Sequence, residues 1–112
     1  RAEDLARIDK YRDRFDLVTA RAVARLNILN ELCLPFVLKS GQFIAMKGSD
    51  PTEEINEAKY SLKQLKANLI KTYSFKLPID QANRHIIIIK KLAATPKQFP
   101  RKAGIPSKEP LI

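Results

Sequence analysis

Three basic residues stand where predicted strands begin or end. Arg21 and Lys47 each follow an apolar segment, and Arg84 comes directly before one. Guanidinium and ammonium groups that gather at one place bind anions, phosphate groups above all. Ligands of an open α/β sheet bind beyond the carboxyl ends of its parallel strands, so the fold decides whether these cations meet. The alternative is three unrelated cations on the surface.

Side chains for other kinds of chemistry are sparse. The chain has one cysteine, Cys33, and one histidine, His85, so we expect no internal disulfide and no metal site. Cys33 lies in the apolar stretch "NELCLPFV", which favours packing over reactivity. The sequence also lacks a glycine-rich phosphate loop, a Ser/His/Asp set and a catalytic carboxylate pair. This stretch therefore cannot be a complete nucleotide-dependent enzyme.

The charge balance favours a polyanionic partner. With 21 basic and 12 acidic residues among 112, the formal net charge is +9. Such a surplus is typical of proteins that bind nucleic acid or an anionic surface. The longest apolar run, 86–89, is too short to span a bilayer, and the charged first residues do not resemble a signal peptide. The length allows one domain or part of one.

The first half of the chain predicts a βαβ unit. Residues 15–20 predict a strand, the apolar spacing over 22–37 predicts an amphipathic helix, and 42–46 predict a second strand. Pro35 is expected to kink or end the helix, and Gly41 is free to take a positive φ in the turn "KSGQ". The two strands should be parallel, with a right-handed crossover.

The second half predicts a helix and then a hairpin. Asp50 can cap a helix whose apolar residues form one face and whose lysines face solvent. Residues 69–77 predict a strand, and the connection to 85–91 is so short that this last strand must return antiparallel. Its four consecutive isoleucines indicate a strand covered from both sides.

These elements bring the three cations to one edge. If the third strand runs parallel to the first two, its end near Leu77 lies at the same edge as Arg21 and Lys47. The hairpin turns there, so Arg84 returns to that edge. The sequence thus predicts an α/β sheet of parallel strands plus a terminal antiparallel hairpin, with a basic edge.

The C-terminal tail, 94–112, is rich in proline and glycine and should be extended, without its own core. Two interpretations remain open. The tail is either a disordered, solubilising basic end, or an arm packed along the sheet edge with Arg101 and Lys102 holding phosphates.

Four segments in fixed order resemble one family: "RAEDLAR…FDLVTARAVARL", "GQFIAMKG", "NRHIIIIKK" and "TPKQFPRKAGIPSKEPL". Together they resemble the C-terminal half of the small-subunit ribosomal RNA guanine-N7 methyltransferase G family, also called glucose-inhibited division protein B. The resemblance implies that 1–93 form the C-terminal half of a Rossmann-like class I methyltransferase domain, followed by the basic tail 94–112. The family's glycine-rich loop would precede Arg1, so we expect the stretch alone to be inactive.

The resemblance also implies roles for single residues. Three positions match contacts with the cofactor, S-adenosylmethionine: Ala2, Glu3 and Arg21. Arg1, Lys47 and Arg84 match other basic positions of the family's site and are expected to bind RNA, together with Arg101 and Lys102 if the tail is a phosphate-binding arm. The implied partner is small-subunit (16S) ribosomal RNA, in a cytoplasmic protein that is monomeric when complete and uses neither metal nor membrane.

The implied reaction is methyl transfer from S-adenosylmethionine to guanine N7. This nitrogen already carries a lone pair, so the site needs alignment of the reactants and no general base. Because a cation beside the sulfonium would be unfavourable, Arg21 is expected to face RNA or the cofactor carboxylate, and Glu3 to accept hydrogen bonds from the adenosine. A non-catalytic RNA-binding module and a purely structural α/β fragment remain alternatives.

Overall fold

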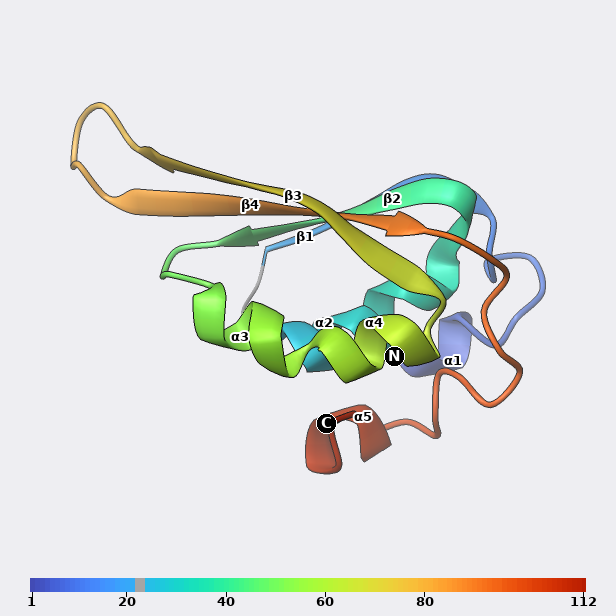
Figure 1. The fold of residues 1–112 in the computed structure, drawn as a ribbon. Helices are drawn as coiled ribbons and strands as arrows, with labels where there is room; N and C mark the ends of the chain where they lie inside the picture. Colours follow the sequence, from blue (N-terminus) through green and yellow to red (C-terminus); the bar gives the residue numbers. More distant parts are fainter. Residues whose placement is uncertain (22–23) are drawn as a thin grey trace.

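The computed structural model describes residues 1–21 and 24–112 and contains one mixed sheet with helices on one side of it (Figure 1). The strands are β1 (Phe15–Arg21), β2 (Val37–Lys47), β3 (Ala67–Lys76) and β4 (Asn83–Lys91). The helices are α1 (Ala2–Leu5), α2 (Leu26–Cys33), α3 (Thr52–Glu57), α4 (Lys59–Gln64) and α5 (Ile105–Lys108), and a 3-10 turn, η1 (Leu34–Phe36), follows α2.

The sheet has the order β1-β2-β4-β3. Strands β1 and β2 are parallel, and β4 is antiparallel to both β2 and β3. Strand β3 therefore points the same way as β1 and β2, although it does not touch them. The predicted α/β class, the parallel pair and the terminal antiparallel hairpin are all confirmed.

The connection from α2 to β2 differs from the prediction. The helix ends at Cys33, because Pro35 lies in the separate turn η1, and β2 begins at Val37. The segment "KSGQ" belongs to β2. It lies where the pairing with β1 is irregular, because Phe15 pairs with Val37 but Leu17 pairs with Gln42. Ser40, with φ of 74°, takes the left-handed conformation that was expected of Gly41.

Gly41 serves a different purpose, close packing of the first two strands. A Cβ atom at this position would lie 2.9 Å from the Asp16 carbonyl oxygen and 2.9 Å from Val37 Cγ1. Such contacts are shorter than van der Waals packing allows, so only glycine fits without a backbone shift.

The single helix predicted from residue 50 is two short helices. They meet at Ala58, which ends α3 and precedes α4. The Asp50 carboxylate accepts hydrogen bonds from the Thr52 N–H (3.0 Å) and hydroxyl (2.6 Å), so it does hold the start of α3. The apolar face is as predicted, with Ala58, Leu62 and Leu65 buried.

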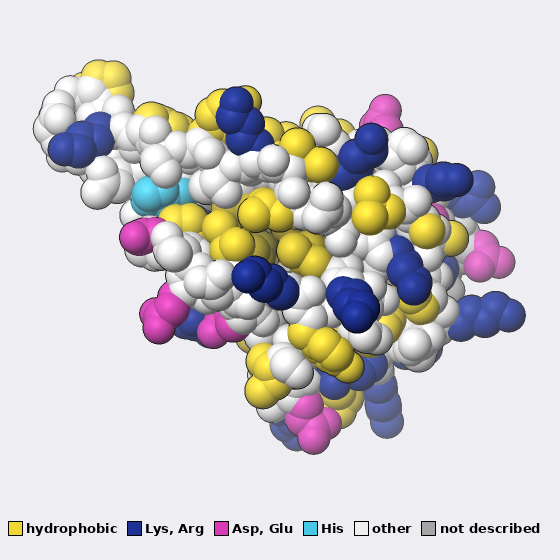
Figure 2. All heavy atoms as spheres, viewed as in Figure 1, with side chains coloured by type: hydrophobic (Ala, Val, Ile, Leu, Met, Phe, Trp, Pro, Cys, Tyr) yellow, Lys and Arg dark blue, Asp and Glu magenta, His cyan; other side chains and the backbone are white. Residues whose placement is uncertain are grey.

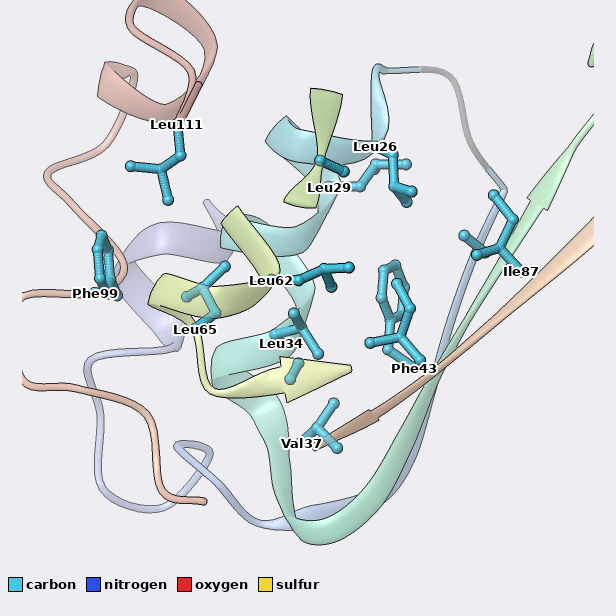
Figure 3. Packing of buried hydrophobic residues seen from close by; sticks show 14 residues of the cluster. Leu26, Leu29, Leu34, Val37, Phe43, Leu62, Leu65, Ile87, Phe99 and Leu111 are labelled. Carbon is cyan, nitrogen blue, oxygen red and sulfur yellow. The ribbon is translucent and has the colours of Figure 1, made fainter. Parts of the chain in front are cut away.

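The core lies between the sheet and the helices (Figure 3). Phe43 and Ile87 point from the sheet toward leucines of α2 and α4, and all are buried. Phe99 and Leu111 belong to the tail and pack on the far side of the helices from the sheet. The tail therefore shares the main core and is folded against the helices, not along the sheet edge.

The opposite face of the sheet has no helix over it in the described part of the chain (Figure 1). In β4, Ile87 and Ile89 are fully buried, whereas Ile86 and Ile88 on the other face are only partly covered. The prediction that the isoleucine strand is covered from both sides is therefore wrong within residues 1–21 and 24–112. We call this bare side, which also carries Leu17, Met46 and Tyr73, the outer face.

Lys91 is fully buried at the end of β4. Its Nζ donates hydrogen bonds to Asp13 Oδ1 (2.9 Å), to the Thr95 hydroxyl (2.6 Å), and to the carbonyl oxygens of Leu34 (2.8 Å) and Val37 (2.9 Å). One ammonium group thus joins the end of β4, the turn η1, the start of β2, the loop before β1 and the tail.

Asp13 is the charged partner in this group. Burial raises the pKa of its carboxyl, but the hydrogen bonds from Thr95 and Lys91 and the charge of Lys91 act oppositely, so the pKa lies below its usual value. A carboxyl with a lowered pKa in the folded state stabilises the fold above its ordinary pKa. That contribution is lost as the pH falls through the folded-state value.

We expect Asp13→Asn to lower the stability at neutral pH and to flatten the acid unfolding profile. Asn tolerates the positive φ of position 13 (51°), so the backbone is kept while Lys91 loses its counter-charge. Removing one partner of a buried ion pair costs about 3–5 kcal/mol. Urea unfolding at neutral pH, and at steps below about pH 4, measures both effects.

The exposed carboxylate variant Asp16→Asn is the control, and it should keep the wild-type profile. If Asp13→Asn lost stability with acid as steeply as wild type, Asp13 would not be a source of the acid sensitivity.

Candidate nucleic-acid interface

The strand register brings the predicted cations to one edge of the sheet. Arg21 pairs with Met46 across β1 and β2, and Lys47 pairs with His85 across β2 and β4. Arg84 is the next residue of β4 toward the hairpin turn. The three backbone positions therefore meet at the carboxyl edge as predicted, but the side chains gather only for Arg21 and Arg84, because Lys47 points to the other face and is buried.

Arg21 and Arg84 also share a face. Paired residues of neighbouring strands lie on the same face, so Arg21 shares a face with Met46, and Met46 shares it with Ile86. Side chains alternate along a strand, so Arg84, two residues before Ile86, lies on that face too. Two strand spacings separate the arginines, about 10 Å across the sheet. Arg21 is exposed, and Arg84 Nη1 lies 3.9 Å from where a Cβ of Gly48 would be. Their guanidinium groups can contact one polyanion together.

Lys47 lies on the inner face and is only 7% exposed. Its Nζ is 2.7 Å from Glu54 Oε1 and donates to the Ala24 carbonyl oxygen at 3.0 Å. Glu54 Oε1 also accepts the Leu26 N–H (3.0 Å), so the pair fastens the start of α2 to α3. The Lys47 ammonium group is therefore bonded inside the protein, where it holds the end of β2 against the helices α2 and α3.

The sequence contained a signal for this difference. Side chains alternate along a strand, so Lys47 lies on the same face of β2 as Phe43 and Ala45, which are both buried. Arg21 lies on the same face of β1 as Leu17, which is exposed. Sequence reasoning also missed Lys76, an exposed cation at the end of β3, one residue beyond Phe75, the partner of Arg84.

Arg1, Ala2 and Glu3 lie by the tail. Glu3 is buried, its Oε2 accepts the Gly104 N–H at 2.9 Å, and the carboxylate is 3.7 Å from Arg1 Nη2. Burial raises the pKa of Glu3, but the backbone hydrogen bonds and the charge of Arg1 lower it to a net value below the usual range. This carboxylate is ionised and already bonded to the protein.

The tail is held by a second buried carboxylate, Glu31 of α2. Arg101 donates from Nη2 to Glu31 Oε1 (2.7 Å), from Nε to the same carboxylate, and from its backbone N–H to Oε2 (2.7 Å). Its Nη2 also donates to the Glu109 carbonyl oxygen (2.6 Å). The neighbouring Lys102 is exposed. Of the two tail cations predicted to bind phosphate, Arg101 is taken up by the fold and Lys102 faces solvent.

The three positions assigned to the cofactor are not brought together. Arg21 lies on the outer face of the sheet, whereas Glu3, which follows Ala2 in α1, is bonded to the tail, and the tail packs on the helices. The Glu3 carboxylate, expected to accept hydrogen bonds from the adenosine, is occupied by Gly104. These residues therefore do not by themselves fit S-adenosylmethionine, and the assignment stays a prediction.

In the described part of the chain, neither Cys33 nor His85 belongs to a cluster of reactive side chains. Burial raises the pKa of the Cys33 thiol to about 12, in line with the predicted packing role. His85 Nδ1 is 2.8 Å from the Ser74 hydroxyl oxygen across the hairpin. Residues 1–21 and 24–112 contain no His/Cys/Asp/Glu group that could hold a metal ion. In the same part of the chain, each helix falls short of the length and apolarity needed to cross a membrane.

A hollow of about 550 Å³ lies away from the basic edge. Its lining is mostly apolar and comes from α3, α4, the start of β3 and residues 92–93, and it excludes Arg21, Lys47 and Arg84. The chemistry of the sheet edge, and not this hollow, defines the candidate site.

Comparison with known proteins gives a consistent result. Residues 1–87 match the GidB family, described as rRNA small subunit methyltransferase G. A Ribosomal RNA small subunit methyltransferase G of Brevibacillus brevis is 50% identical over 112 residues, which is 100% of this chain and 47% of the relative. The proteins of that name from Staphylococcus aureus strain JH9 (52% over 102 residues, 91% of this chain and 43% of the relative) and Halalkalibacterium halodurans (50% over 111 residues, 99% and 47%) agree.

The chain spans about half the length of these curated relatives. The family match covers most of the chain, the Brevibacillus brevis relative covers all of it, and the resemblance found in the four sequence segments is confirmed. The chain therefore belongs to the GidB family of rRNA small subunit methyltransferase G proteins.

Proposed function

We propose that this chain is the RNA-binding portion of an S-adenosylmethionine-dependent methyltransferase that acts on guanine N7 of small-subunit (16S) ribosomal RNA. The observation that carries the proposal is the pair Arg21 and Arg84, which share one edge and one face of the sheet. The names of the relatives, which are about 50% identical to this chain, support methyl transfer to small-subunit rRNA, and the guanine N7 target rests on the resemblance of the four sequence segments.

The chemistry of guanine suits a protein surface of this kind. Because N7 is a nucleophile without deprotonation, an enzyme must hold the RNA and align the base, and it needs no basic side chain at the reacting atom. S-adenosylmethionine, when bound, supplies the methyl group. In this proposal Ala2, Glu3 and Arg21 remain the candidates for cofactor contact, and residues outside this chain complete that site.

Phosphate binding is assigned to the cations that the fold leaves available. Of the predicted cations, Arg21 and Arg84 lie on the outer face, and Lys102 of the tail is exposed; Arg1 lies 3.7 Å from Glu3, but its side chain is 63% exposed and can still reach a phosphate. Lys47 and Arg101 act indirectly, since each is paired with a carboxylate and holds an element in place. The excess of cations then attracts the RNA backbone, while base contacts select the target.

The proposal extends to the organisation of the protein. Residues 1–93 belong to the catalytic domain, and 94–112 form a basic tail, packed on the helices, that presents Lys102 to RNA. The complete protein works as a monomer in the cytoplasm, where small ribosomal subunits are found.

A non-catalytic RNA-binding module is the second candidate. It is favoured by one observation: the residues of this chain form a basic edge, while the residues assigned to the cofactor are separated and Glu3 is bonded to Gly104. Methyl transfer, tested below, distinguishes the two.

We expect the double variant Arg21→Ala/Arg84→Ala to bind a small-subunit rRNA fragment more weakly and with less dependence on salt. The slope of log K against log salt is negative, and each lost phosphate contact reduces its magnitude by about 1. Fluorescence anisotropy with a labelled RNA, from about 50 to about 200 mM salt, measures affinity and slope together.

Lys39→Ala is the matched control, because Lys39 is an exposed cation at the other end of β2. It should keep the wild-type slope. A flat salt profile in the wild-type chain, or equal slopes in the double variant and the control, would contradict the proposed interface.

Methyl transfer is tested in a chimera in which this chain replaces the aligned part of the Brevibacillus brevis relative. We expect the chimera to transfer labelled methyl groups to 16S rRNA, and Arg84→Ala to raise KM for RNA more than it lowers kcat, because Arg84 binds the backbone in both ground and transition state. The parent protein and Lys39→Ala are the controls. A folded chimera that binds RNA without transferring methyl groups would favour the non-catalytic module.

A further inference from the structure

The β3–β4 hairpin extends beyond the other two strands (Figure 1). Strand β2 ends at Lys47, the partner of His85. Past that point Phe75 pairs with Arg84 and Lys76 pairs with Asn83, and within residues 1–21 and 24–112 no other strand pairs with them. We call residues 75–84 the projecting hairpin. It leaves the sheet at the edge that carries Arg21.

The tip of the projecting hairpin presents an isoleucine to solvent. Ile79 is 98% exposed, so its side chain makes almost no contact with the protein. The turn around it is nonetheless tied by hydrogen bonds: the Leu77 N–H donates to the Ala82 carbonyl (2.9 Å), the Gln81 N–H to the Leu77 carbonyl (3.1 Å), and the Ala82 N–H to Asp80 Oδ1 (2.9 Å). A structured turn thus holds a large apolar group in water, where burial on a partner would be favourable.

An aromatic ring and cations accompany this isoleucine. Phe75 is 45% exposed and stands directly opposite Arg84, so ring and guanidinium lie on the same face of the hairpin. Figure 2 shows hydrophobic side chains beside Lys and Arg side chains toward the end of the hairpin. Exposed aromatic rings stack on nucleic-acid bases, and adjacent cations hold the phosphates.

The proposed substrate gives these groups a purpose. An enzyme that reacts with a base in structured RNA must take that base out of the stack, which costs free energy. Proteins that distort nucleic acids often insert an apolar side chain between bases to compensate for the lost stacking. A hydrogen-bonded, projecting turn with an exposed isoleucine has the shape for this insertion, and it lies next to the arginines assigned to the RNA backbone.

We propose that the projecting hairpin unstacks the RNA beside the target guanine. Ile79 fills the space between bases, and Phe75 stacks on a neighbouring base while Arg84 holds its phosphate. This inference rests on the proposed RNA-binding function and adds to it the element that opens the substrate. Ile79 is therefore a positioning residue, because it acts on the RNA structure and not on the reacting atoms.

The test uses the 112-residue chain and an rRNA hairpin with 2-aminopurine next to a guanine in its loop. The fluorescence of 2-aminopurine increases when the base loses its stacking partners. We expect wild type to increase this signal on binding. Ile79→Ser should lose most of the increase while it keeps RNA binding and its salt dependence, because the cations are untouched and the turn keeps its backbone hydrogen bonds.

Ile112→Ser is the matched control, since Ile112 is 83% exposed but lies at the C-terminus, away from the hairpin. It should behave as wild type. A second pair separates stacking from insertion: Phe75→Leu should weaken RNA binding roughly tenfold, and Tyr60→Leu, which removes an exposed ring from α4, should not.

Two results would overturn the inference while the RNA interface stands: an undiminished fluorescence increase with Ile79→Ser, or RNA binding by wild type with no increase at all. Failure of wild type to bind RNA in the salt titration would instead overturn the proposed function, and this inference with it. Equal losses in Ile79→Ser and Ile112→Ser would show a general effect of lost apolar surface and contradict insertion by the hairpin.

Discussion

The ammonium group of Lys91 is the constraint on which the architecture depends. Burying a charge is costly unless every hydrogen-bonding position is used, and here a carboxylate, two carbonyl oxygens and a hydroxyl satisfy it. These partners come from segments that are far apart in the sequence. Because Lys91 ends the central strand β4, the same contact fixes this strand against the start of β2 and, through Asp13, the approach to β1. The basic edge lies at the other end of these strands, so its spacing depends on this connection.

Three buried or partly buried ion pairs share one arrangement. Lys91 with Asp13 and Arg101 with Glu31 join segments distant in sequence, and Lys47 with Glu54 joins the end of β2 to the helix α3 that follows it. In each pair the charges cancel, so the net charge of +9 is carried by the remaining residues, most of them on the surface. The cations thus divide into those that hold the fold and those available to a polyanion. Charge counting alone does not make this division.

Much of the fold could be predicted because its signals are local. Apolar runs marked the strands, the short connection after Leu77 required an antiparallel return, and together these placed Arg21 and Arg84 at one edge. The burial of Lys47 and Lys91 could also have been predicted, since each lies on the same face of its strand as buried neighbours. Other features depend on distant partners. Nothing near Arg101 in the sequence indicates that a glutamate seventy positions earlier holds it, and the cofactor assignments could not anticipate that Gly104 meets Glu3.

The glycine at position 41 gives the first two strands their separation. A methyl group there would press on the backbone of one strand and on a valine of the other, and the cheapest relief is for the strands to diverge where they start. If the strands diverged at that end, β1 would change its angle to β2, and Arg21 at its other end would move with it. A residue that touches neither RNA nor cofactor would then govern how far apart two guanidinium groups stand, and so which pair of phosphates they can span.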